Sequence, residues 1–262
     1  MPLRRLTRYL AREIALAVPF DIAMSVSRTL LSAQGFGSGG SVSSSGEVGV
    51  LKEVSGAAPV LVDVGGHTGE YTAAFLRLHP GGICHVFEPS ERHFTLLESQ
   101  LRGRKNVTLS QKALGAEAGE QTLYKDAEVT GLASLTKRRV EHHGLSMDIT
   151  EQVAVDTLDR IVEERGISRI DLLKIDVEGH ELDVLRGGRG ALERGIVKLI
   201  QFEFGGCNLD TRTTFQDFFY LFRDVGFQVG VVQPTGRLQW LATYDEMLEQ
   251  YRTTNFVARP VR

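Results

Sequence analysis

The stretch RIDLLKIDVEGHE, residues 169–181, joins a mostly apolar run to a polar turn and then to the start of a helix. The same order occurs upstream, in VLVDVGGHTG (60–69) and in ICHVFEPSE (83–91). Apolar runs that alternate with helical segments are typical of a parallel sheet whose two faces are covered by helices. The sequence around this stretch therefore predicts an α/β fold.

The remaining pattern extends this fold on both sides. Seven main strands are expected, at 60–65, 83–89, 107–114, 169–176, 196–204, 226–233 and 254–260. Helices are expected at 69–78, 91–101, 157–165, after residue 176 and at 214–225. The last of these has Phe215, Phe218, Phe219 and Phe222 at helical spacing, which is typical of core residues. The alternating stretches 120–125 and 151–156 have no helical pattern between them, which indicates an antiparallel insertion.

Composition excludes several classes of protein. The chain has 262 residues, of which 42% are apolar and 24% charged, so neither wholesale disorder nor a collagen-like protein is expected. The formal charge of -3 lacks the basic excess of nucleic-acid-binding proteins, and we expect no nucleic acid partner. Cys84 and Cys207 are too far apart in sequence to suggest a zinc motif or a disulfide framework, which fits a reducing compartment.

Three parts are expected along the chain: an amphipathic helical segment (1–33), a Gly/Ser-rich linker (34–46) and one domain (47–262). The apolar stripe of the first part includes Leu3, Leu6 and Leu10 and lies beside several arginines. It could pack on protein, as a lid or dimer helix, or make weak contact with an anionic membrane surface. No window is apolar enough to span a bilayer, so we expect a cytoplasmic protein that could be peripheral to the inner face of the membrane. The sequence does not indicate the oligomeric state.

Ligands of open α/β sheets bind beyond the carboxyl ends of the strands. The turn after the first strand reads DVGGHTG (63–69), whose glycines let the backbone approach a ligand closely, but its spacing is not the dinucleotide fingerprint. The carboxylate of Asp63 would repel a pyrophosphate and suits a cationic ligand such as S-adenosylmethionine. Glu88 ends the second strand, where a carboxylate can accept both hydroxyl hydrogens of a ribose.

A second group of charged residues follows the strand 169–176. Lys174 and Asp176 are two residues apart and so lie on one face of the strand. Glu203, on the strand predicted to lie beside it, could converge with Asp176, and two such carboxylates either share a proton or hold Mg²⁺. Alternatively, Glu203 could form only a salt bridge to Lys174. His180 is interpreted as a first-turn helix residue.

These motifs resemble the FkbM family of S-adenosylmethionine-dependent methyltransferases. The matching blocks are VDVGGHTGEY (62–71), VFEPS (86–90), KALG (112–115), GLASL (131–135), VDTLD (155–159), LLKIDVEGHELDVLRG (172–187) and FEF (202–204). The resemblance implies a class I, Rossmann-like methyltransferase fold with seven strands. It also implies methyl transfer to a hydroxyl of a sugar, glycan or secondary-metabolite acceptor.

The resemblance further implies roles for individual residues. Those expected to bind the cofactor are Asp63, Gly65, Gly66, Thr68, Gly69, Glu88, Pro89, Ala113, Leu114 and Ser134. The resemblance places Asp176 facing the methyl group and the acceptor. Because a protonated alcohol is a poor nucleophile, we expect Asp176 to be the catalytic base, Lys174 to keep it ionised, and Glu203 to orient it or to bind Mg²⁺ with it. The turn GGHTG departs from the common G-A-N-x-G, and residues 1–46 lie outside the resemblance.

Three further expectations stay open at this point. Trp240, Tyr244 and Tyr251 could form the wall of an acceptor pocket or only pack. The two alternative functions are an NAD-dependent oxidoreductase, against which the glycine spacing argues, and a non-catalytic or membrane-surface binding module on the same fold.

Overall fold

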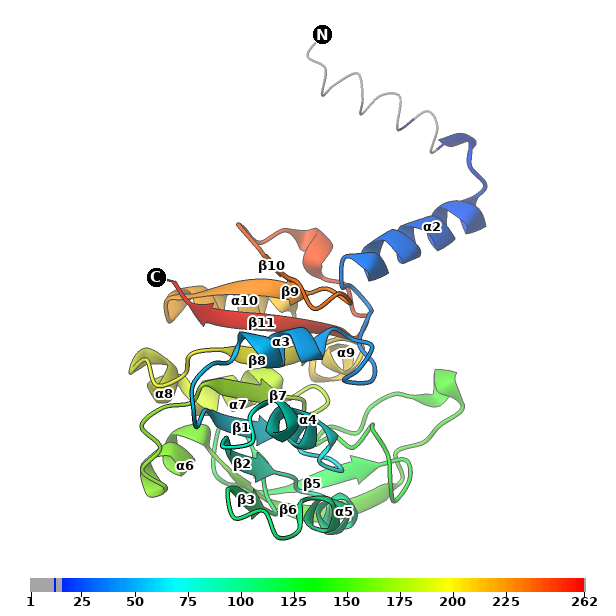
Figure 1. Ribbon diagram of the computed structural model, residues 1–262. Helices are drawn as coiled ribbons and strands as arrows, with labels where there is room; N and C mark the ends of the chain where they lie inside the picture. The colour runs from blue at the N-terminus through cyan, green and yellow to red at the C-terminus, as the bar shows by residue number, and fades with distance from the viewer. Residues whose placement is uncertain (1–11, 13–15, 262) are drawn as a thin grey trace.

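The structure, a computed structural model, describes Arg12 and residues 16–261 (Figure 1). Its central sheet contains the strands β1 (Val60–Val64), β2 (Ile83–Phe87), β3 (Val107–Ser110), β7 (Leu172–Ile175), β8 (Ile200–Phe204), β9 (Phe227–Val232), β10 (Leu238–Trp240) and β11 (Thr254–Pro260). The strand order is β10-β9-β11-β8-β7-β1-β2-β3. β8, β7, β1, β2 and β3 run parallel, whereas β11 pairs antiparallel with both β8 and β9. The predicted α/β fold with a mostly parallel sheet is confirmed.

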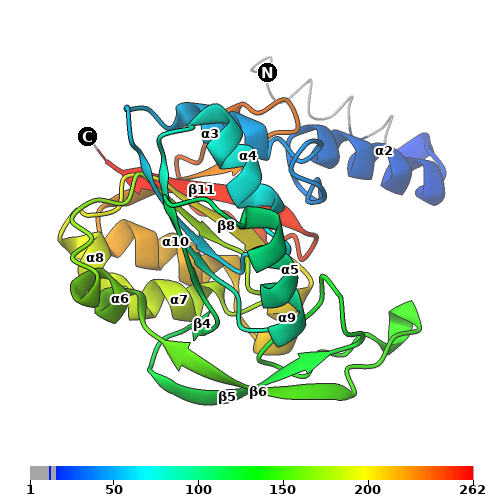
Figure 2. The ribbon, with the colours of Figure 1, turned by 60° about the horizontal axis from the view of Figure 1, so that its bottom comes forward.

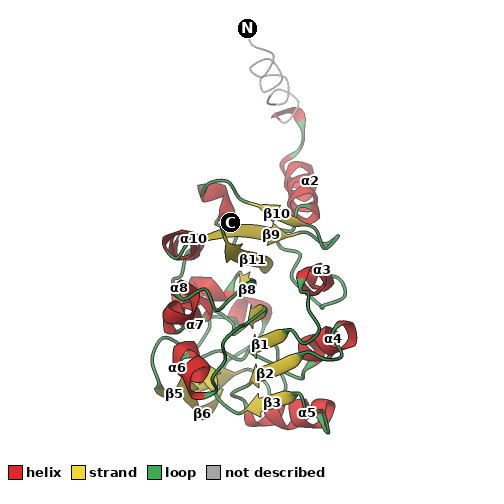
Figure 3. Ribbon diagram, turned by 60° about the vertical axis from the view of Figure 1, so that its left-hand side comes forward, coloured by secondary structure: helices red, strands yellow, loops and turns green. Residues whose placement is uncertain are grey.

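Helices cover both faces of this sheet (Figures 2 and 3). One face packs against α6 (Leu158–Glu164), α7 (Glu181–Gly187), α8 (Arg189–Glu193) and α10 (Phe215–Asp224). The other packs against α3 (Glu47–Glu53), α4 (Glu70–Leu78) and α5 (Glu91–Leu101). The expected core positions Phe215, Phe218 and Phe222 of α10 are fully buried. Each face thus has its own apolar core.

A second, three-stranded sheet lies beside the main one (Figure 2). It contains β4 (Ala113–Leu114), β5 (Gly119–Lys125) and β6 (Ile149–Asp156), in the order β4-β6-β5. β5 and β6 pair antiparallel, as the alternating stretches predicted. The 3-10 turn η1 (Glu141–His143) lies in the connection between them.

Three elements differ from the sequence-based expectation. The single strand predicted at 107–114 is two strands, because the chain leaves β3 after Ser110 and joins β6 as β4. The helix expected after residue 176 is interrupted at Gly188, which packs closely against Leu158 of α6, and becomes α7 and α8. The main sheet contains the seven expected strands and an eighth, β10, at its edge, where it pairs with β9.

Residues 34–46 are packed against the body, which contradicts the prediction of a flexible linker. The main-chain N–H of Gly37 donates to Oγ1 of Thr254, and that of Gly39 donates to the carbonyl oxygen of Thr253. A Cβ at Gly46 would lie only 2.1 Å from the carbonyl oxygen of Gln233. The glycines here allow close contact between backbones rather than flexibility.

The helix α2 (Phe20–Ala33) projects from the body and buries none of its residues (Figure 1). Its exposed side chains include Phe20, Ile22 and Leu30. Most of the predicted stripe of leucines before it lies outside the described residues. None of the helices in the described part of the chain combines the length and apolar character needed to cross a membrane.

The chain after α8 completes the body. α9 (Cys207–Thr211) follows β8, and the 3-10 turn η2 (Glu246–Leu248) precedes β11. Both cysteines, Cys84 and Cys207, are buried and free.

Candidate active site

A cavity of about 300 Å³ opens at the carboxyl ends of β1, β2 and β7. The residues that line it come from the segment before β1, the turn after β1 and the start of α4, the end of β2, α5, β4, β5, the loop between β5 and β6, and the end of β7. The predicted site residues among them are Gly65, Gly66, Thr68, Glu88, Pro89, Ala113, Leu114, Lys174 and Asp176. Asp63, Gly69, Ser134 and Glu203 do not line this cavity.

The turn after β1 requires glycine at two adjacent positions for different reasons. Gly65 has a φ of 85°, and a Cβ there would lie 1.8 Å from the carbonyl oxygen of Asp176. A Cβ at Gly66 would lie 2.3 Å from a methyl group of Val86. Without side chains, these residues bring the main chain of β1 against the ends of β2 and β7. The main chain of this turn therefore lies exposed on one wall of the cavity.

Glu88 is buried at the end of β2, and its two carboxylate oxygens accept hydrogen bonds from main-chain N–H groups. Oε2 accepts from His67 at 2.8 Å, and Oε1 accepts from Ser90 at 2.9 Å. Burial raises the pKa of Glu88 to about 7, although both hydrogen bonds oppose the shift. Each oxygen keeps a lone pair for a ligand hydroxyl.

Asp63 lies behind the turn rather than in the cavity, which corrects its predicted direct contact with the methionine end of the cofactor. Its side chain is fully buried, and Oδ2 accepts a hydrogen bond from Oγ1 of Thr72 at 2.6 Å. Oδ1 is buried and has no hydrogen-bond partner in the structure. Burial raises the pKa of Asp63 to about 6, against the opposing charge of Lys174.

Ser134 also lies outside the cavity, where it fixes a loop. Its hydroxyl donates to the carbonyl oxygen of Glu178 at 2.7 Å, and its main chain pairs with Tyr124. This links the loop between β5 and β6 to the turn after β7. Ala113 and Leu114, in contrast, line the cavity from β4 and give it an apolar wall, and an adenine site there stays a prediction.

Lys174 and Asp176 form an ion pair inside the cavity, as their spacing predicted. Nζ of Lys174 donates to Oδ2 of Asp176 at 2.9 Å. The lysine side chain is 6% exposed and the aspartate side chain 36% exposed, so the carboxylate is the partner that reaches open space. Burial favours the neutral lysine, but the charges of Asp176 and Asp63 outweigh it and hold the pKa of Lys174 above its usual range.

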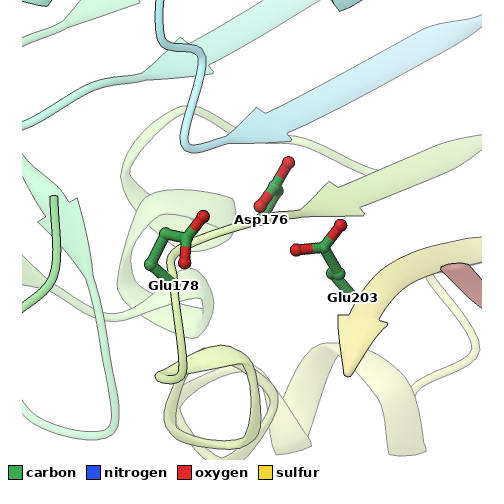
Figure 4. Close-up of side chains that lie close together, drawn as sticks. All are labelled: Asp176, Glu178 and Glu203. Atoms are coloured by element: carbon green, nitrogen blue, oxygen red, sulfur yellow. The ribbon is translucent and has the colours of Figure 1, made fainter. Parts of the chain in front are cut away.

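Asp176, Glu178 and Glu203 point toward one another from three positions at this sheet edge (Figure 4). One carboxylate oxygen of each lies within 4.8 Å of the others. Burial and the charge of Asp176 raise the pKa of Glu178 to about 8, although Arg138 opposes the shift. Burial and the same charge also raise the pKa of Glu203. The predicted convergence of Glu203 with Asp176 is present, and Lys174 pairs with Asp176 rather than with Glu203.

Other polar residues near this cluster have structural partners. Arg138 donates to Glu178 at 2.5 Å. Glu181 accepts main-chain hydrogen bonds from Val177 and Gly179 at the start of its own helix. His180, the residue before α7, lies 2.9 Å from both Asp183 and Thr136 through its two ring nitrogens.

Sequence reasoning missed a buried network from the segment before β1. Oε1 of Glu47 accepts from Nε2 of Gln201 at 2.6 Å, and Tyr71 donates to Oε1 of the same glutamine at 2.6 Å. Nζ of Lys174 lies 4.9 Å from the centre of the Tyr71 ring. Glu47 also lines the cavity, together with Gly40, Ser41 and Val42. Only the tertiary fold brings this segment to the site, so no local pattern could indicate it.

The aromatic residues near the last strand do not line the cavity. Trp240 packs under the guanidinium of Arg259, and Tyr251 packs on Phe204. Tyr244 lines a separate hollow beside α10 and β9. Trp240 and Tyr251 thus pack against neighbouring side chains and do not form a wall of this cavity.

Comparison with known proteins decides the family. The model of the methyltransferase FkbM domain matches residues 63–229, which include the glycine turn, Glu88 and the Lys174–Asp176 pair. The chain belongs to the FkbM methyltransferase family. This membership confirms the family resemblance and favours a methyltransferase over an NAD-dependent oxidoreductase.

Several curated methyltransferases match about half of this chain. Methyltransferase 1 of Beauveria bassiana is 29% identical over 146 residues, which are 48% of this chain and 57% of that protein. The 2-O-methyltransferase NoeI of Sinorhizobium fredii is 26% identical over 52% of this chain and 60% of its own length. The 31-O-demethyl-FK506 methyltransferase FkbM of Streptomyces tacrolimicus is 32% identical over 49% and 58%. The chain thus spans less than two thirds of the length of these relatives.

Solved structures show more distant similarity. The methyltransferase FkbM of Methylobacillus flagellatus aligns with a TM-score of 0.46 and 16% identity, over 90% of this chain and 60% of that one. A SAM-dependent O-methyltransferase of Thermotoga maritima aligns with a TM-score of 0.45 and 13% identity, over 82% and 64%.

Proposed function

We propose that this protein transfers a methyl group from S-adenosylmethionine to a hydroxyl oxygen of a small-molecule or glycan acceptor. The observation that carries the proposal is one cavity that combines two kinds of polar group. The buried carboxylate of Glu88 and the glycine turn line it together with the Asp176–Lys174 ion pair. The names of two relatives specify O-methyl transfer, which supports oxygen as the methylated atom.

The residues of the cavity fit this cofactor. Glu88 can accept hydrogen bonds from ribose hydroxyls, and Ala113 and Leu114 offer apolar contact to an adenine. The main chain at Gly65 and Gly66 lies open to the methionine end. The negative charge of the lining suits a ligand with ammonium and sulfonium groups. When bound, the cofactor supplies an activated methyl group.

Asp176 would act as the general base toward the acceptor. Its carboxylate would take the proton of the acceptor hydroxyl as the new oxygen–carbon bond forms and the carbon–sulfur bond breaks, which would leave S-adenosylhomocysteine. Lys174 would hold this carboxylate in position and ionised through the 2.9 Å hydrogen bond. The walls of the cavity would exclude water and align the acceptor, which supplies much of the rate enhancement in displacements of this kind.

The substitution Asp176→Asn tests this assignment. It keeps the shape of the side chain and removes the base, so we expect S-adenosylhomocysteine affinity within a few fold of the wild type and no detectable turnover. Calorimetry measures the affinity, and transfer of a radiolabelled methyl group to a panel of hydroxylated acceptors measures turnover. Asp148→Asn, at an exposed position, is the matched control. Near-normal turnover in Asp176→Asn rejects Asp176 as the base.

A divalent cation at the carboxylate cluster is a second candidate mode of catalysis. Asp176, Glu178 and Glu203 would supply the oxygen ligands that Mg²⁺ prefers, and the ion would lower the pKa of the acceptor hydroxyl. This mode predicts loss of activity in EDTA and recovery with Mg²⁺. Activity that is indifferent to chelation favours the metal-free base, with the cluster sharing protons instead.

The first 33 residues would attach the protein weakly to a membrane surface and would take no part in methyl transfer. The exposed apolar side chains of α2 are the observation that favours weak contact with a membrane surface. Co-sedimentation of the full chain with anionic vesicles tests it, and a chain that starts at residue 34 is the comparison. Equal sedimentation of the two proteins contradicts the attachment.

A further inference from the structure

Both main-chain polar groups of Thr130 are bonded to histidine side chains. Its N–H donates to Nε2 of His93 at 3.1 Å, and its carbonyl oxygen lies 3.2 Å from Nε2 of His67. The two imidazole rings lie against each other, with their centres 4.3 Å apart. His67 belongs to the turn after β1 and His93 to α5. One residue of the loop between β5 and β6 is thus held by two separate elements.

The partners fix whether Nε2 of each ring carries a hydrogen. An N–H group can only donate, so Nε2 of His93 carries no hydrogen and the ring is neutral. Burial and the nearby His67 lower the pKa of His93 to about 4, in agreement with this state. The carbonyl of Thr130 can only accept, so Nε2 of His67 donates, and Nδ1 of His67 lies 3.3 Å from Oγ1 of Thr68. Each main-chain group of Thr130 therefore faces a ring nitrogen of the complementary kind.

The loop that these histidines hold forms one wall of the cavity. Thr130, Gly131, Ala133 and Leu135 all line it. The other main-chain attachment of the loop is at Ser134, which exchanges two hydrogen bonds with Tyr124 of β5. A Cβ at Gly131 would meet no atom within 4 Å, so packing around this residue does not fix the loop. Its placement between Asp126 and Ser134 thus depends strongly on Thr130.

We propose that His67 and His93 are positioning residues, which together clamp Thr130 and keep the 126–135 loop closed over the cofactor. This inference rests on the proposed function, because it assigns the clamp to retention of S-adenosylmethionine. Both histidines also line the cavity, and the proposal gives neither of them a role in methyl transfer itself. His93 also lies with Nδ1 3.8 Å from Oε1 of Glu88, so the clamp connects the loop to the carboxylate expected to bind the ribose.

The substitution His93→Leu tests the clamp in the full-length protein. Leucine fills the buried site but cannot accept from Thr130, so we expect amide hydrogen exchange at residues 128–133 to accelerate at least tenfold. We also expect S-adenosylhomocysteine to dissociate at least tenfold faster, measured by stopped-flow displacement. His67→Asn tests the second bond independently, because asparagine tolerates the positive φ of 47° but is too short to reach Thr130.

A conservative variant and a matched control separate positioning from general destabilisation. The amide oxygen of His93→Gln can accept from Thr130, so we expect this variant to restore most of the protection. His79→Leu removes a comparable bond, 3.0 Å from Nε2 to the carbonyl oxygen of Leu51, at the end of α4. It should leave both the exchange of residues 128–133 and the dissociation rate unchanged.

The outcomes distinguish the clamp from the proposed function. Unchanged exchange at residues 128–133 in both His93→Leu and His67→Asn overturns the clamp. Faster exchange with an unchanged dissociation rate overturns its role in cofactor retention. A wild-type protein that does not bind S-adenosylhomocysteine rejects the proposed function, and with it that role, whereas the exchange measurement still decides whether the clamp holds the loop.

Discussion

Glu88 is expected to make cofactor affinity depend on pH near neutrality. Its pKa is raised to about 7 by burial, and an ionised carboxylate can accept from two ribose hydroxyls where a protonated one cannot. Cofactor binding should therefore release a proton, and the affinity should rise with pH and level off above about 7. Below that value we expect a loss of roughly tenfold per pH unit. Calorimetry with S-adenosylhomocysteine from pH 5.5 to 8.5 measures this.

Two variants identify the group responsible. Glu88→Gln should lower the affinity at pH 8 and remove most of its pH dependence. Glu91→Gln, at an exposed position in the first turn of α5, should leave both unchanged. A pH dependence that persists in Glu88→Gln would assign it to another group, such as Asp63, whose pKa is raised to about 6.

Alanine substitutions at Gly65 and Gly103 separate the cost of backbone strain from the cost of steric overlap. Gly65→Ala places a Cβ 1.8 Å from a main-chain oxygen of Asp176, in addition to the cost of a positive φ. Gly103 has a similar φ of 77° but no atom within 4 Å of the same position. We expect Gly103→Ala to lower the free energy of unfolding by about 1 kcal/mol. Gly65→Ala should lower it by at least about 2 kcal/mol more. Urea denaturation measures both, and equal losses would contradict the steric argument.

At the residue scale, sequence reasoning found the site residues that follow strands and missed those brought in by tertiary structure. Lys174, Asp176 and Glu88 could be predicted because the end of a strand fixes where a side chain lies. Glu47 and His93 could not, because each lies on a helix whose pattern is ordinary. Their roles depend on contacts with residues far away in sequence.

At the scale of elements, the segment 36–47 is part of the cavity wall. Gly40, Ser41 and Val42 line the cavity, and the hydroxyl of Ser45 donates to the buried carboxylate of Glu47 at 2.7 Å. A chain starting at residue 34 should therefore keep its affinity for S-adenosylhomocysteine. A chain starting at residue 47 should lose at least about tenfold in affinity and about 2 kcal/mol in stability, because it leaves a buried acceptor unpaired.

Calorimetry and urea denaturation on the two shortened chains check this prediction. Equal affinity and equal stability of the two shortened chains would show that residues 34–46 contribute neither to cofactor binding nor to folding. The comparison also separates the role of residues 34–46 from any role of α2, which both shortened chains lack.

Strands and helices were more predictable than their interruptions. Apolar runs and helical spacing located the parallel strands and α10, because burial on a sheet or helix face leaves a periodic signal. The break between β3 and β4 leaves none, since it depends on pairing with β6. The Gly/Ser composition of 34–46 was interpreted as flexibility, whereas its glycines permit contact with β9 and β11. Composition alone does not distinguish these two uses of glycine.

At the scale of the whole molecule, the charge of the cavity should select the acceptor. Five residues with carboxyl groups line it, Glu47, Glu70, Glu88, Asp176 and Glu178, and Lys174 is the only lysine or arginine among the lining residues. Glu178, whose pKa is about 8, is mostly protonated at neutral pH and adds little to this charge. Like charges disfavour binding by several kcal/mol when water is excluded. A neutral sugar should therefore be methylated at least about tenfold faster than the corresponding uronic acid. Radiolabelled methyl transfer measures the ratio, and Glu70→Gln should reduce it. Equal rates for the two sugars would contradict electrostatic selection.

The contact between Gly37 and Thr254 joins residues 217 positions apart. A ribosome adding about 5 to 20 residues per second makes the second residue roughly 10 to 40 seconds after the first. Throughout that interval the hydrogen bonds from Gly37 and Gly39 to Thr254 and Thr253 cannot form, so a nascent chain with β1 and β2 already paired has not yet fixed the segment that forms one wall of its cavity. Full affinity for the cofactor should consequently arise only after Thr254 has been synthesised.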